Sequence, residues 1–137
     1  MSGITEIDRL LAEMQPELRE GTFVYCVVPF AEAERCYCLQ PLATFREEEG
    51  LSLILPQSVA DATGLAASAP MRMITLTVHS SLEAVGLTAA IATALTREGI
   101  SANVVAAFHH DHVFIPADDA ERALAALKAL SRNRPQR

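Results

Sequence analysis

The sequence has few basic residues, and this shortage argues against a nucleic-acid partner. Eleven Lys and Arg stand against 17 Asp and Glu in 137 residues, which gives a formal net charge of −6. A chain with this balance repels phosphate backbones, and it contains no basic stripe with interleaved aromatic residues. We therefore expect an acidic protein whose partners do not include nucleic acid.

Cysteines and long apolar runs are also scarce. Cys26, Cys36 and Cys38 follow no zinc or disulfide spacing, and no secretory signal is evident, so we expect reduced thiols in a cytoplasmic protein. The longest apolar run, residues 84–95, contains a glycine and two threonines and falls short of the roughly 18 residues needed to cross a bilayer. We expect no membrane partner and no cofactor.

Apolar residues, by contrast, are plentiful. Half of the residues are hydrophobic, which is more than a lone, fully solvated domain of this length usually carries. Part of this apolar surface therefore covers an oligomer interface in our interpretation, and we expect a homodimer.

Hydrophobic periodicity divides the chain into short helices and strands. Residues 30–42 fit neither pattern well, and an acidic turn of three glutamates, ending at Gly50, joins two strands of a hairpin. The remaining expected elements are a helix over 7–14, a strand over 22–28, a helix ending at Gly64, strands over 71–79, 101–108 and 113–116, and helices over 81–98 and 118–130.

Two segments of the chain resemble each other at an offset of 60 residues. "LILPQSVAD", residues 53–61, and "VFIPADDAE", residues 113–121, share three apolar residues, a proline, an alanine and an acid in the same order. Chance similarity is one explanation, and an internal duplication is the other. Under the second, a degenerate N-terminal unit with a leading helix covers residues 1–66, and a second unit covers residues 67–137.

The second half predicts a split βαβ arrangement. A right-handed crossover from residues 71–78 to 101–108 is expected to make a parallel pairing, and the following strand then returns antiparallel. The expected last helix carries one apolar stripe, so we expect the helices of this half to pack on one side of the sheet.

A polar triplet, His79-Ser80-Ser81, stands between the strand over 71–78 and the expected helix over 81–98. Ser80 and Glu83 match a capping box, which is the simpler interpretation. A second is a binding site for a carboxylate at the free helix amides, with His79 beside it. Thr88 and Thr93 are the only polar residues over 84–95, so we expect that helix to be buried on two sides, although an alanine-rich helix also tolerates exposure.

Residues 109–112, His-His-Asp-His, are the other chemical candidate. His109, His110, Asp111 and His112, with His79, could bind a transition metal, and the alternative is a solvated turn. Cysteines 26 and 36 have no signature of a catalytic nucleophile around them, so we expect a protein that is not an enzyme.

The segment "MRMITLTVHSSLEAVGLTAAIATALTREGISANVVAAFHHDHVFIPADDAERALAAL" resembles the ACT domain, and the whole chain resembles small bacterial proteins with two ACT-like units. The resemblance implies an α+β fold of two fused ferredoxin-like (βαββαβ) units, with antiparallel-containing sheets and helices on one side. No strand follows the last helix, so we expect the strand "FVYCVV" of the other half to complete the sheet and interlock the units.

The resemblance also implies a function and a site. ACT domains are regulatory modules that bind amino acids or similar small molecules, often at an interface between units or subunits. The implied function is a non-enzymatic regulatory module for an amino acid or related metabolite; the alternatives are a metal-binding protein and a dimerisation scaffold. The implied ligand-binding residues are His79, Ser80, Ser81, Leu82, Glu83, Ala84, Val85, Gly86, where the glycine allows close approach, and Asn103.

Overall fold

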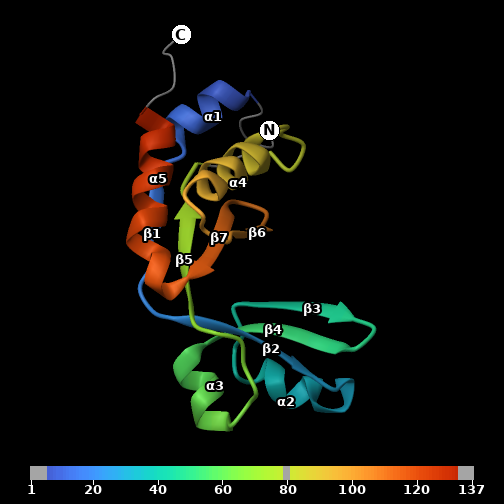
Figure 1. The fold of residues 1–137 in the computed structure, drawn as a ribbon. Coiled ribbons are helices and arrows are strands. Elements are labelled where there is room, and N and C mark those ends of the chain that lie inside the picture. The colour runs from blue at the N-terminus through green and yellow to red at the C-terminus, as the bar shows by residue number, and fades with distance from the viewer. Residues whose placement is uncertain (1–5, 79–80, 133–137) are drawn as a thin grey trace. The chain divides into compact units, whose positions relative to one another are not determined.

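The computed structural model describes residues 6–78 and 81–132, and these form an α+β fold with a seven-stranded antiparallel sheet (Figure 1). The chain divides into two compact units. Unit 1 contains residues 1–20 and 72–137, and unit 2 contains residues 21–71. The α+β class expected from the sequence is confirmed.

Unit 2 is a short hairpin sheet with two small helices. Its elements are β2 (Phe23–Val28), the 3-10 helix η1 (Phe30–Glu32), α2 (Ala33–Tyr37), β3 (Ala43–Glu47), β4 (Gly50–Pro56) and α3 (Gln57–Thr63). β4 pairs antiparallel with both β2 and β3. Residues 30–42, which fit neither helical nor strand periodicity, thus form a short crossover that contains η1 and α2. α3 ends at Gly64, as the sequence predicts.

Unit 1 has a fuller set of elements. They are α1 (Ile7–Glu13), β1 (Pro16–Leu18), β5 (Met71–Leu76), α4 (Leu87–Arg97), β6 (Asn103–Ala106), β7 (Asp111–Pro116), the 3-10 helix η2 (Ala117–Asp119) and α5 (Ala120–Arg132). The strands run in the order β1-β5-β7-β6.

One expectation about this sheet is wrong, and another is met only in part. β7 lies between β5 and β6, so the crossover through α4 does not make a parallel pair of neighbouring strands. β1 pairs with β5, with Leu18 opposite Ile74, and β2, the expected "FVYCVV" strand, is paired with β5 only through Phe23 and Met71. A three-residue strand is too short for hydrophobic periodicity to detect.

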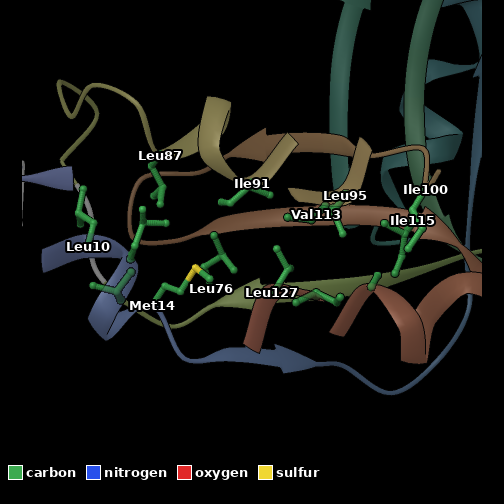
Figure 2. Packing of buried hydrophobic residues seen from close by; sticks show 14 of the residues in the cluster. Leu10, Met14, Leu76, Leu87, Ile91, Leu95, Ile100, Val113, Ile115 and Leu127 are labelled. Carbon is green, nitrogen blue, oxygen red and sulfur yellow. The ribbon is translucent and has the colours of Figure 1, made fainter. Parts of the chain in front are cut away.

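The leading helix contributes to the core of unit 1. Leu10, Leu11 and Met14 are at most 1% exposed and pack in one cluster with residues of α4, α5 and the strands (Figure 2). The sequence grouped this helix with the first unit, but its apolar face completes the core of the unit that contains residues 72–132.

α4 begins later and is less buried than expected. Its first residue is Leu87, and its buried positions are Leu87, Ile91 and Leu95, a single stripe directed at the core of unit 1 (Figure 2). Thr88 and Thr93 on the rest of its surface are exposed in this chain. The expectation that this helix is buried on two sides is therefore wrong for the single chain.

The offset of 60 residues is preserved in three dimensions. In β3 and β4, Arg46 pairs with Leu51, and in β6 and β7, Ala106 pairs with Asp111. Residues 51–60 and 111–120 have the same succession of buried, half-buried and exposed positions, and each segment turns into a helix after a proline. The two hairpins are thus the same structural element used twice.

Candidate functional site

A pocket of about 160 Å³ lies in unit 1, where the loop before α4 meets the turn end of the β6–β7 hairpin. Its lining residues are Ser81, Leu82, Ala84, Gly86, Leu87, Thr88, Ala106 and Asp111. Four of these belong to the predicted ligand-binding loop. His79 and Ser80, two further polar members of that prediction, lie outside the described residues.

The loop over 81–86 is a turn and not a helix. The Ser81 hydroxyl accepts a hydrogen bond from the backbone N–H of Glu83 at 3.0 Å, and the Ser81 carbonyl accepts one from Ala84 at 3.0 Å. Serine often stabilises such local turns at the expense of helix. The expected helix start at Ser81 is wrong, and with it the capping of α4 by the serine-glutamate motif.

Gly86 is the N-cap residue of α4, and its φ of +101° explains why it is glycine. A residue with a Cβ is strained at this φ. A Cβ built here would meet Ile7 at 3.5 Å, which is an ordinary contact. The glycine is therefore needed for its backbone conformation, and the close approach that we expected from the sequence is not its reason.

Gly86 and the first two residues of α4, Leu87 and Thr88, line the pocket. The first amides of the helix, at residues 87–89, precede its first internal hydrogen bond, which Ala90 donates to the Gly86 carbonyl at 3.0 Å. Gly86 has no side chain with which to accept from them. Helix N-termini carry partial positive charge and exposed N–H donors, so this wall of the pocket suits an anion.

Asp111 forms part of the opposite wall. It is the first residue of β7, and its side chain is on the same sheet face as Val113 and Ile115, which are core residues of unit 1. Asp111 is 9% exposed and Ser81 is 5% exposed. The pocket thus combines a positive helix end, a buried hydroxyl and a buried carboxyl group.

The sequence missed Asp111 as a pocket residue because we interpreted residues 109–112 as a metal site or a solvated turn. The hairpin turn ends at His110, and Asp111 and His112 are already in β7. The repeat at an offset of 60 residues indicates that Asp111 lies in a strand, because Leu51, at the corresponding position, is near the start of an apolar strand.

The other predicted residues divide into two groups. Glu83 and Val85 are exposed and lie on the loop beside the pocket. Asn103 is the first residue of β6, and its side-chain nitrogen Nδ2 donates to the Phe114 carbonyl at 3.4 Å. Asn103 lies three residues along the strand from Ala106, about 10 Å away, so the structure does not bring it to the pocket.

The residues at 109–112 do not converge on a metal position. Asp111 faces the pocket, whereas His112 Nδ1 lies 3.0 Å from Thr75 Oγ1 on the other face of the sheet, and the rings of His109 and His110 are 6.3 Å apart. Within residues 6–78 and 81–132, no three His, Cys, Asp or Glu side chains are grouped to hold a metal ion.

His112 belongs to a polar chain across three strands. Arg19 Nε donates to Thr75 Oγ1 at 3.2 Å, and Arg19 Nη1 donates to Glu17 at 2.9 Å. Burial lowers the pKa of His112 below its ordinary value of 6.5, and His110 also lowers it, while Asp111 opposes the shift. Neutral imidazole is therefore favoured at this position in the folded chain.

Comparison with known families finds two matches. A family described as ACT domain matches residues 2–72, and another with the same description matches residues 68–129. No curated protein matches the sequence. Within the described part of the chain, each helix is too short or too polar to cross a membrane.

Solved structures show the same fold. A Vibrio cholerae protein of unknown function, described as a possible transport protein, is 50% identical, with a TM-score of 0.82 over 90% of this chain and 94% of that one. An Agrobacterium tumefaciens protein has 16% identity and a TM-score of 0.67, covering 85% and 87%. The ligand-free regulatory subunit of aspartate kinase from Thermus thermophilus has 13% identity and a TM-score of 0.64, covering 84% and 95%.

Proposed function

Because the chain belongs to the ACT domain family, we propose that it is a non-enzymatic regulatory module that binds an amino acid or a related small metabolite in the pocket of unit 1. The observation that carries the proposal is the burial of Ser81 and Asp111, two polar side chains, in the walls of one pocket. Buried polar side chains that line a concave pocket are typical of binding sites.

The chemistry of the pocket fits a small carboxylate. The amides at the start of α4 provide donors and partial positive charge for the carboxylate oxygens, and the hydroxyls of Ser81 and Thr88 add polar groups. A pocket of about 160 Å³ is of a size that suits a small metabolite.

Solved structures with this fold include regulatory subunits. Regulatory subunits of aspartate kinase share this fold, in Thermus thermophilus and in Thermus flavus, at identities of 13% and 15%. These identities show the fold alone, so the amino acid and the regulated partner of this chain are separate questions.

The proposal includes a second copy of the chain next to the pocket. Leu82 and Val85 on the loop are 65% and 82% exposed, and Phe108 on the β6–β7 turn is 65% exposed. Large apolar side chains that are exposed together beside a pocket are typical of an interface. Ligand bound there would be shielded by the partner, and occupancy would change how the two copies associate.

A thermal-shift screen tests the function. The full chain is heated with each of the twenty amino acids and with small carboxylates, and a ligand at 100 times its dissociation constant should add about 2.7 kcal/mol of stability. Ser81→Ala should reduce this stabilisation, because it removes a pocket hydroxyl and the bond that orders the loop. Ser58→Ala, at an exposed position of α3, is the matched control.

Two outcomes count against the proposal. If no compound shifts the melting temperature, the chain is a scaffold without a ligand. If a compound shifts it equally in the wild type and in Ser81→Ala, the ligand binds elsewhere.

A further inference from the structure

The leading helix α1 contacts the chain on both sides of the loop over 81–86, which lines the pocket (the pocket loop). Before this loop, the backbone N–H groups of Thr77 and Val78 donate to the Met14 carbonyl at 2.9 and 3.4 Å. Thr77 Oγ1 also donates to the Gln15 carbonyl at 3.0 Å. The chain that leaves β5 towards the pocket is therefore fixed to the C-terminal end of α1.

The other end of the pocket loop rests on the first turn of α1. The side chain of Ile7 faces Gly86, since Ile7 Cδ1 and Cγ1 each lie 3.5 Å from the position that a Cβ on Gly86 would take. Leu10 and Leu87, the first residue of α4, are buried in one cluster, and Ile7 packs against it (Figure 2). The residue at which the loop passes into α4 is therefore in contact with α1.

α1 itself depends on this packing. It has seven residues, and its N-cap residue Glu6 makes no side-chain capping bond. A helix of this length is unstable in isolation. Leu10, Leu11 and Met14, each at most 1% exposed, supply the apolar contacts that hold it. Helix formation in α1 and its docking on unit 1 are therefore one equilibrium.

We infer that Ile7 and Thr77 are positioning residues of the pocket: α1 orders the pocket loop, and ligand binding and the docking of α1 stabilise each other. The inference rests on the proposed function and adds the element through which the pocket is regulated. A ligand that binds only the ordered loop holds α1 in place by the same free energy with which α1 raises its affinity. A partner or condition that lifts α1 therefore releases the ligand.

Hydrogen exchange of the full chain without ligand tests the positioning. The N–H groups of Glu83 and Ala84 bond to Ser81, so their exchange reports the order of the pocket loop. Ile7→Ala and Thr77→Val each remove a contact that holds one end of the loop. Each should speed exchange at both amides by about fivefold or more, because the loop then opens more often.

Three control variants separate positioning from a general loss of stability. Leu124→Ala truncates a half-buried leucine of α5 that packs on the same core, and it should leave the exchange of the pocket loop unchanged, since local openings do not follow the global stability. Ile7→Val and Thr77→Ser keep an apolar side chain and a hydroxyl at the two positions and should restore slow exchange. Thr77→Val carries the test if Ile7→Ala does not fold.

Calorimetric titration tests the coupling to the ligand. The probe is whichever of the twenty L-amino acids stabilises the wild type most. Its affinity should fall by about fivefold or more in Ile7→Ala and in Thr77→Val, and should stay at the wild-type value in Leu124→Ala. In the wild type, a saturating amount of this amino acid should slow exchange of the Leu10 amide, which donates to the Glu6 carbonyl at 3.0 Å.

The outcomes separate this inference from the function on which it rests. Unchanged exchange of the pocket loop in both Ile7→Ala and Thr77→Val overturns the positioning role, with or without a ligand. Amino-acid affinity that is the same in these variants as in Leu124→Ala overturns the coupling and leaves the proposed function intact. Failure of the wild type to bind any amino acid overturns the proposed function and the coupling together, and the exchange data still decide the positioning.

Discussion

The two hairpins of this protein have the same register and different chemistry. In unit 2, Arg46 contacts an aromatic ring, and its pairing partner Leu51 lies in the apolar core. In unit 1, the corresponding residues Ala106 and Asp111 line a pocket. The backbone arrangement is therefore not what makes a site. The same hairpin register places an acid and a small residue beside a pocket in unit 1, and a leucine and an arginine in unit 2.

The largest expected effects concern the two cores. Leu10 in unit 1 and Leu53 in unit 2 are both fully buried leucines, so Leu10→Ala and Leu53→Ala should each cost about 2–5 kcal/mol. Hydrogen exchange should show where the loss occurs: in α4 and β5 for the first, and in β2 and β3 for the second. Increased exchange in unit 2 alone for Leu10→Ala would contradict the assignment of the leading helix to unit 1.

The turn ends of the hairpins should differ in their tolerance of a side chain. Gly50 has a φ of +148°, and a Cβ there would lie 2.4 Å from the Val28 carbonyl oxygen, whereas the corresponding residue of unit 1 is His110. Gly50→Ala should therefore destabilise the chain by about 1–3 kcal/mol in a urea titration. His110→Ala should change stability much less, and equal losses in the two variants would count against this comparison.

Exchanging the pocket residues should make unit 1 behave like unit 2. The double variant Ala106→Arg, Asp111→Leu places the residues of the unit 2 hairpin at the same register positions. It should fold, because those residues already occupy this hairpin geometry in unit 2, and it should lose stabilisation by any amino acid found in the thermal-shift screen. A folded double variant that retains the full shift would show that the pocket is not the site.

The smallest expected effect is a dependence of stability on pH that belongs to unit 1. His112 takes up its proton at lower pH in the folded chain than its ordinary pKa of 6.5, so just below that value the unfolded chain binds more protons. Stability should consequently fall as the pH drops through this window, with a slope of at most about 1.4 kcal/mol per pH unit for one proton.

His112→Asn should remove this slope, because asparagine does not titrate and keeps a polar partner for Thr75. His109→Asn, which changes an exposed histidine of the same hairpin, should keep the slope. Urea unfolding over a series of pH values is the measurement. A rise in stability on acidification, or the same slope in both variants, would contradict the role given to His112.

The sequence predicted the parts of the fold that depend on patterns several residues long. The proline junctions of the two hairpins, the strand over 23–28 and the apolar stripe of α5 are confirmed, because alternation, proline and a helical stripe are each directly visible. Comparing those patterns at an offset of 60 also identified the duplicated hairpin, whose register agrees residue by residue.

The missed features depend on single residues or on distant partners. Gln15, with a φ of +41°, turns the chain into the three-residue strand β1, and its partner β5 is more than fifty residues away. The loop over 81–86 has the composition of a helix, and only the positive φ of Gly86 shows that the helix starts after it. For the candidate pocket, four of the residues predicted from the sequence line it, and Asp111, which also lines it, was not predicted as a ligand-binding residue.

The most direct test of the account is the location of ligand-induced chemical-shift changes in the backbone amides. The chain, labelled with ¹⁵N, is titrated with the amino acid that gives the largest thermal shift. The account predicts saturable changes at Ser81, Gly86, Thr88, Ala106 and Asp111, and no comparable changes at the corresponding hairpin positions Arg46 and Leu51. Changes of equal size at both hairpins, or changes that avoid residues 81–88, would contradict the claim that unit 1 alone has the binding chemistry.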